Sequence, residues 1–235
     1  MFAKIRFYYG AATISLIAAG IMVPLMMLFR DKTNIILHKY NALILKLLGG
    51  KIETTGVRDN SVDMFAINHQ GIIDIIAMEA AELSNIRWVA KKELFDAPWF
   101  GYLLKLPNMV CVDRENRAGL IKLLKDAKET KEGEEHRILA IFPEGTRTNK
   151  QKLLPFKGGT RIVAEKLRLR IQPVIITNSK RLLNEHNKTA HRATVHITYL
   201  EPFTVDKQDK EWYKKLQAQM QEQIDKEKNL YERER

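Results

Sequence analysis

The chain has 235 residues, of which 45% are hydrophobic and 29% charged, a composition typical of one globular α/β domain with a small appendage. Its single cysteine excludes an internal disulfide. The formal charge of +11 is concentrated in residues 145–192, where twelve Lys or Arg accompany two acidic residues for a net charge of +10. This segment predicts either an anionic partner or a solvated basic face. On charge alone, that partner is a phosphate-bearing small molecule, an anionic membrane, an acidic carrier protein or nucleic acid.

The N-terminal part of the chain is strongly apolar. No residue from Phe7 to Phe29 is charged, and as a helix the segment would extend about 35 Å, enough to cross a hydrocarbon core of about 30 Å with some tilt. Pro24 predicts a kink in it. An amphipathic helix is predicted at residues 34–48. We interpret residues 1–50 as membrane-associated helices, either a spanning anchor or a two-helix hairpin in one leaflet; a core helix of a soluble protein is the alternative.

The flanking charges predict the side of the membrane. If the first segment spans, the positive-inside rule keeps the following domain on the cytoplasmic side. A hairpin in one leaflet would hold that domain against the same face. We therefore expect the protein at the cytoplasmic face of the cell inner membrane, as an integral or monotopic protein. The basic residues that decide this are Arg30, Lys32, Lys39 and Lys46 after the segment, against Lys4 and Arg6 before it.

Residues 51–235 read as an α/β domain, because short apolar runs alternate with amphipathic helices after Gly49 and Gly50. The predicted fold is a single, mostly parallel sheet flanked by helices. The last strand alternates apolar and polar residues, which predicts burial of one face only, with His196 on the solvent face. Strands are expected at 51–55, 63–67, 86–90, 109–112, 137–142, 172–177 and 193–200, and helices at 72–83, 117–132, 157–167 and 209–230.

His69 and Asp74 form the first candidate catalytic pair. Residues five apart on an α-helix point about 140° away from each other, so the two side chains cannot meet on one helical face. If residues 63–67 form a strand and the helix begins at Ile72, His69 lies at the carboxyl end of the strand, where open α/β sheets place ligand sites. Asp74 then lies in the first helical turn and can fold back to hold one imidazole nitrogen. The pair predicts a general base.

A second polar loop follows the predicted strand at 137–142 and reads Pro143-Glu144-Gly145-Thr146-Arg147. Gly145 allows a ligand to approach the backbone closely, Arg147 can grip a phosphate through two nitrogens, and Glu144 can accept a hydrogen bond from a hydroxyl. The two loops predict a base and an anion clamp at one edge of the sheet. This combination can activate an alcohol on a phosphorylated substrate.

Four blocks in this order resemble the glycerolipid acyltransferases, typified by 1-acylglycerol-3-phosphate (lysophosphatidic acid) acyltransferases. The resemblance covers roughly residues 60–180. One departure is Gly71, where many relatives carry serine; another is Lys157-Gly158-Gly159, where relatives often have a second basic residue. The matching blocks are Asn-His-Gln-Gly-Ile-Ile-Asp at 68–74, Lys-Lys-Glu-Leu at 91–94 with Pro98, Gly101 and Val-Asp-Arg at 112–114, Phe-Pro-Glu-Gly-Thr-Arg at 142–147, and Ile-Gln-Pro-Val-Ile-Ile at 171–176.

The resemblance implies roles for particular residues. His69 is the expected base and Asp74 its partner. Arg147 is expected to bind the substrate phosphate, with assistance from Lys91 and Arg114. Glu144 is expected to hold the glycerol backbone. Gly145 and Thr146 complete the substrate-binding set.

The implied reaction transfers a fatty acyl group from a thioester, acyl-CoA or acyl-ACP, to the sn-2 hydroxyl of lysophosphatidic acid to give phosphatidic acid. With no serine or cysteine beside His69 in the sequence, we expect direct attack. The expected partners are the lipid bilayer and these two substrates. We expect no resident cofactor or metal and no nucleic acid. The alternatives are another acceptor, such as glycerol 3-phosphate or a different lysolipid, or a non-catalytic protein that binds membrane surfaces or nucleic acid.

Overall fold

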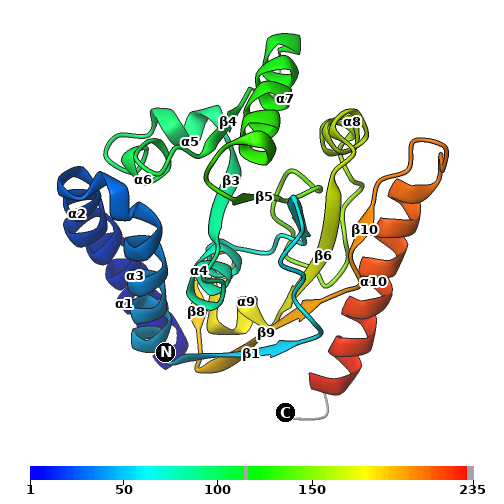
Figure 1. The fold of residues 1–235 in the computed structure, drawn as a ribbon. Helices are drawn as coiled ribbons and strands as arrows, with labels where there is room; N and C mark the ends of the chain where they lie inside the picture. The colour runs from blue at the N-terminus through cyan, green and yellow to red at the C-terminus, as the bar shows by residue number, and fades with distance from the viewer. Residues whose placement is uncertain (114–115, 232–235) are drawn as a thin grey trace.

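One sheet forms the centre of the molecule, and helices cover both of its faces (Figure 1). The computed structural model describes residues 1–113 and 116–231. Seven strands hydrogen-bond in the order β1-β9-β6-β2-β5-β3-β4, and β10 pairs with β6 beside this path. Their bounds are β1 Gly50–Thr55, β2 Met64–Ile67, β3 Asn85–Lys91, β4 Val110–Val112, β5 Arg137–Ile141, β6 Arg170–Thr177, β9 Ala193–Tyr199 and β10 Phe203–Thr204.

The sheet is mostly parallel. From β6 through β2, β5 and β3 to β4, each strand runs parallel to its neighbour, whereas β9 is antiparallel to β6. The predicted α/β fold with a mostly parallel sheet is therefore confirmed. All residues of β2 are buried, as are all but the first of β5. Strands covered on both faces need such continuous apolar runs.

Two helical layers sandwich the sheet. On one face, α3 (Thr33–Leu48) packs against α4 (Ile72–Ala81). The opposite face is covered by α7 (Arg117–Glu132), α8 (Gly158–Leu167) and α10 (Trp212–Tyr231). The strands and α-helices absent from the sequence prediction are short: α5 Lys92–Asp96, α6 Tyr102–Lys105, α9 Ser179–Leu182, the strand β10, and a hairpin of β7 Leu183–Asn184 with β8 Thr189–Ala190.

The N-terminal apolar segment forms a nearly continuous helix of α1 (Phe2–Ile17), a π-helical turn at Ala18–Met22, and α2 (Val23–Leu28). A short 3₁₀ turn at Arg30–Lys32 then leads into α3. The π-helical turn lies directly before Pro24, whose ring nitrogen has no hydrogen to donate to the helix.

Among the described helices, Phe2–Leu28 alone is long and apolar enough to cross a membrane. Only 22% of its most apolar 18-residue stretch is buried within the protein. A core helix of a soluble protein would be covered far more completely. The second predicted membrane helix, α3, instead packs apolar residues such as Ile36 and Ile44 into the core against α4.

One face of β9 differs from the prediction. His196 and Thr198 are each only 7% exposed, so both faces of the strand are buried and His196 is not a solvent-face residue. The cause is α10, which brings Glu227 within 2.6 Å of the hydroxyls of both Thr177 and Thr198. A polar strand face can be buried in this way when its hydroxyls are hydrogen-bonded.

Candidate active site

His69 and Asp74 meet between the end of β2 and the start of α4, as the sequence predicts. The imidazole Nδ1 lies 3.0 Å from Asp74 Oδ2, the carboxylate is fully buried, and 11% of the His69 side chain is exposed. Because Nδ1 donates its proton to the carboxylate, the lone pair of the neutral ring lies on Nε2. That nitrogen can accept a proton from a substrate hydroxyl.

Asp74 also fixes the loop that carries His69. It is the third residue of α4, and its Oδ2 accepts the backbone N–H groups of Gln70 at 2.5 Å and Gly71 at 2.8 Å. A carboxylate in the first turn is favoured there by the helix dipole and by these otherwise unpaired donors. The carboxylate that orients the imidazole therefore also holds the two residues directly before the helix start.

The His69 loop is joined to the neighbouring loop after β5. Because β2 and β5 are adjacent and parallel, both loops leave the same edge of the sheet. The His69 N–H donates to Glu144 Oε1 at 2.9 Å, and the Thr148 N–H donates to the His69 carbonyl at 3.0 Å. On the other side, the Asn68 amide group bonds both the N–H and the carbonyl of Ile176, at 2.7 and 2.9 Å.

Glu144 is hydrogen-bonded to the backbone of the loop that carries His69. Its carboxyl is fully buried and accepts the N–H of His69 through one oxygen and that of Leu154, at 2.7 Å, through the other. Burial raises the pKa of Glu144, and the two N–H donors offset part of that rise. Glu144 therefore positions the backbone of His69, and its expected contact with the glycerol backbone stays a prediction.

An aromatic column supports the imidazole from one side. The Phe142 ring stacks on His69 with 3.8 Å between ring centroids and on Trp88 with 5.3 Å. The Trp88 indole N–H donates to Glu79 Oε1 at 2.6 Å. This stack of rings restricts the His69 ring to one plane. At the Trp88 end, the stack is hydrogen-bonded to the buried carboxyl group of Glu79.

Glu79 makes folding stability depend on pH. Burial raises its pKa from 4.5 to about 7, partly offset by the Trp88 hydrogen bond and by Arg137. The folded-state pKa is raised, so the contribution to stability is fully present below about pH 4.5 and is lost as pH rises through about 7.

We expect Glu79→Gln to remove this dependence. The free energy of unfolding of the wild type, minus that of the variant, should fall by about 3 kcal/mol between these pH values in denaturant titrations. A constant difference would contradict the prediction.

Arg147 lies at the same sheet edge and is paired with an acidic residue that the sequence prediction does not include. Its Nη1 is 3.0 Å from Glu185 Oε1, and 46% of its side chain is exposed. Glu185 comes from the turn of the β7–β8 hairpin and also contacts Lys180 Nζ at 3.4 Å. Both cations therefore share one carboxylate.

The remaining predicted substrate residues are spread along this edge. Lys91 is exposed at the end of β3, and Thr146 is exposed beside Arg147. Gly145 is buried and has a φ of +70°, a left-handed conformation that glycine adopts readily. Arg114 lies outside the described residues.

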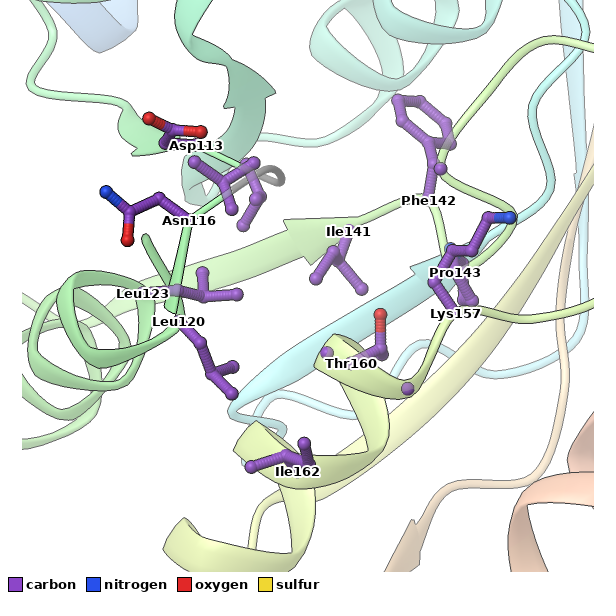
Figure 2. A pocket seen from close by; sticks show the side chains of 15 residues that line it. Asp113, Asn116, Leu120, Leu123, Ile141, Phe142, Pro143, Lys157, Thr160 and Ile162 are labelled. Atoms are coloured by element: carbon purple, nitrogen blue, oxygen red, sulfur yellow. The ribbon is translucent and has the colours of Figure 1, made fainter. Parts of the chain in front are cut away.

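Two cavities border Phe142. The larger, a cleft of about 640 Å³, lies between the start of α8, the helix α7 and the Pro143–Gly145 loop (Figure 2). Figure 2 shows Lys157 on the same side as Phe142, with Leu120 and Leu123 opposite. The smaller cavity, of about 140 Å³, lies among apolar residues of the N-terminal helices, α3, α4 and α6, and Arg147 also lines it. Space is therefore available on both sides of Phe142, the residue that stacks on His69.

Sequence reasoning missed Asn68, Phe142 and Glu185 as parts of the site. Asn68 and Phe142 stand inside the matching blocks, so their positions were visible although their contacts were not. Glu185 is 113 residues from Ile72, whose N–H it accepts, and no local pattern signals that contact.

One family model and several known proteins match this chain. A model of the family described as Acyltransferase matches residues 53–177. A 1-acyl-sn-glycerol-3-phosphate acyltransferase of Helicobacter pylori is 41% identical over 178 residues, which are 75% of this chain and 74% of that protein. A protein of the same name from Cocos nucifera is 28% identical over 76% of this chain and 58% of its own length.

A solved structure shares the fold. The crystal structure of the 1-acyl-sn-glycerophosphate (LPA) acyltransferase PlsC from Thermotoga maritima superimposes with a TM-score of 0.76, covering 96% of this chain and 94% of that one. The sequences are 20% identical, so this likeness concerns the architecture alone. The family model spans more than half of the chain and the Helicobacter pylori protein matches three quarters of it. On this evidence, the chain belongs to the acyltransferase family.

Proposed function

We propose that this acyltransferase moves a fatty acyl group from acyl-CoA or acyl-ACP to the sn-2 hydroxyl of 1-acylglycerol 3-phosphate, giving phosphatidic acid for phospholipid synthesis. The observation that carries the proposal is the His69–Asp74 pair, joined by backbone hydrogen bonds to the loop that presents Arg147. A base beside a phosphate-binding cation suits an acceptor with both a hydroxyl and a phosphate. The names of the Helicobacter pylori and Cocos nucifera relatives support the same substrate.

The arrangement favours a single displacement. The substrate oxygen forms a bond to the thioester carbonyl carbon while His69 Nε2 takes the hydroxyl proton. The tetrahedral intermediate then expels the thiolate, which can receive that proton from the imidazolium. Among the described residues, the side chains that hydrogen-bond to or stack on the imidazole are Asp74 and Phe142, neither of which is an alcohol or thiol. The acyl group is therefore passed directly to the acceptor, and the chemistry requires no resident metal or cofactor.

The apolar cavity and the N-terminal helix suit lipid substrates. The cavity of about 140 Å³ is lined by Phe142 and Arg147 and by residues of the N-terminal helices such as Ile14 and Met22, so apolar surface lies beside the site. Burying that chain in protein or membrane avoids exposing it to water at about 0.8 kcal/mol per CH₂. We place the protein at the cytoplasmic face of the cell inner membrane, held by the apolar helix Phe2–Leu28 either across the bilayer or within one leaflet.

The test is a matrix of donors and acceptors with the membrane-reconstituted full chain. Palmitoyl-CoA and palmitoyl-ACP are each offered with 1-acylglycerol 3-phosphate, glycerol 3-phosphate, a lysophospholipid with a larger headgroup and 1-acylglycerol without phosphate. The proposal expects the highest kcat/KM for 1-acylglycerol 3-phosphate. A higher kcat/KM for any other acceptor would replace it with that substrate.

Arg147→Ala is expected to weaken use of the phosphorylated acceptor. Loss of one charge-assisted contact corresponds to a rise in acceptor KM of about 10- to 100-fold. Transfer to 1-acylglycerol without phosphate should change little. Arg181→Ala, at an exposed residue of α9, is the matched control and should keep the wild-type acceptor KM. Equal loss with both acceptors would remove Arg147 from the phosphate-binding role.

A further inference from the structure

The Glu185 carboxylate is held by three donors at the start of α4. Oε1 lies 3.0 Å from Arg147 Nη1 and 3.2 Å from the backbone nitrogen of Ile72, and Oε2 lies 3.4 Å from Lys180 Nζ. Only 16% of the Lys180 side chain is exposed, and Glu185 is its one anionic contact among the described residues. An arginine, a lysine and a backbone N–H around one small anion form a donor set that also recognises phosphate.

The position of this donor set relative to the catalytic pair matters for its role. Ile72 is three residues after His69 and begins the helix that carries Asp74. Arg147 is followed directly by Thr148, whose N–H donates to the His69 carbonyl. A phosphate bound here would therefore contact one residue three positions after His69 and another next to the hydrogen-bond partner of His69. An acceptor whose hydroxyl lies close to its phosphate requires such a short separation between phosphate and base.

We propose that Glu185 competes with the phosphate of the acceptor for one anion site, formed by Arg147, Lys180 and the Ile72 N–H. The inference rests on the proposed acceptor, and it adds Lys180 to the phosphate-binding residues. A phosphate monoester carries a charge of about −1.5 to −2 near neutral pH. It cannot share these donors with a carboxylate at contact distance, because like charges at that separation repel strongly. Glu185 must move away for the phosphate to bind.

The local structure allows this movement. Glu185 lies in the hairpin turn, where Asn184 Oδ1 accepts the N–H groups of His186 and Asn187 and holds the backbone independently of the Glu185 side chain. Rotation of that side chain toward solvent is sufficient. Gly71 makes its present position possible, since a Cβ atom built there would lie 2.6 Å from Glu185 Oε2. The backbone of Gly71 is extended, so alanine fits the conformation and would push only the end of a flexible side chain.

Two variants test the competition by different means. Glu185→Gln removes the charge, and Glu185→Ala removes the whole carboxyl group. Both should lower the acceptor KM, by about tenfold if the wild-type site is open one tenth of the time. Lys180→Ala should raise it. Glu201→Gln, at an exposed residue, is the control and should leave the acceptor KM unchanged.

A second readout does not depend on acyl transfer. Inorganic phosphate should raise the Tm of Glu185→Gln more than that of the wild type, because a ligand that binds the folded state stabilises it in proportion to its affinity. Adding Lys180→Ala to Glu185→Gln should abolish the extra shift. The same phosphate should inhibit Glu185→Gln at lower concentration than it inhibits the wild type.

The outcomes separate this inference from the proposed function. If the wild type prefers another acceptor but phosphate still gives the larger Tm shift in Glu185→Gln, the acceptor assignment fails and the anion site stands. If the wild type uses 1-acylglycerol 3-phosphate and Glu185→Gln raises its KM without a larger phosphate shift, Glu185 supports Arg147 instead of competing with substrate. That result would overturn the proposal.

Discussion

His69→Ala is expected to lower kcat for acyl transfer by about 10²- to 10⁴-fold, the range that a positioned general base supplies. Nothing else in the described site can take over, because the Glu144 carboxyl is turned to the backbone of His69 and Leu154 and Asp74 is fully buried. The donor and acceptor KM values should change less, since the imidazole acts on the transferring proton. Single-turnover rates with saturating substrates would isolate this step.

Two controls make the His69 result interpretable. Removing the imidazole also removes the ring that stacks on Phe142 at 3.8 Å, so the Tm of the variant must be compared with that of the wild type. His136→Ala changes an exposed histidine whose ring hydrogen-bonds to the Asn60 carbonyl, and it should retain wild-type kcat. A folded His69→Ala protein with near-normal kcat would exclude His69 as the base.

The longer elements of the fold were predictable from sequence because each carries a repeating signal. Helix α7 spans the predicted residues, and the buried strands β2 and β5 lie within one or two residues of their predicted limits. Elements such as α6 and α9 contain four residues each, too few to display a helical period. The buried polar face of β9 depends on Glu227, which lies 29 residues from Thr198, and local alternation cannot reveal such a cover.

In the candidate site, the relation set by a short stretch of sequence was predictable, whereas the contacts set by packing between distant segments were not. His69 and Asp74 were predictable as a pair because five residues of chain and one helix start fix their relation. The direction of the Glu144 side chain was not, because its partners, His69 and Leu154, compete with any substrate for the same oxygens. The pairing of Arg147 with Glu185 depends on the placement of the β7–β8 hairpin against α1 and α9, which is a property of the packed fold.

Asp74→Asn tests the positioning half of the catalytic pair and is expected to reduce kcat by about as much as His69→Ala, about 10²- to 10⁴-fold, because Asp74 acts through His69. The amide is similar in size, so the loss comes from chemistry. Its oxygen can still accept a backbone N–H, but its NH₂ group cannot accept the Nδ1 proton of His69, and the site loses the negative charge that stabilises the imidazolium. If the amide oxygen instead faces His69, the carboxylate charge is still lost.

Stability measurements distinguish loss of the Asp74 charge from disruption of the loop that carries His69. Asp74 Oδ2 accepts hydrogen bonds from the backbone N–H groups of Gln70 and Gly71 and from Nδ1–H of His69. Asp74→Ala leaves these donors unpaired and should lower the free energy of unfolding by about 1–3 kcal/mol for each buried one, which Asp74→Asn should largely avoid. The expected pattern is therefore two variants with similarly low kcat and different stabilities. Near-normal kcat in a stable Asp74→Asn protein would mean that Asp74 serves only to build the start of α4, and that His69 works without a charged partner.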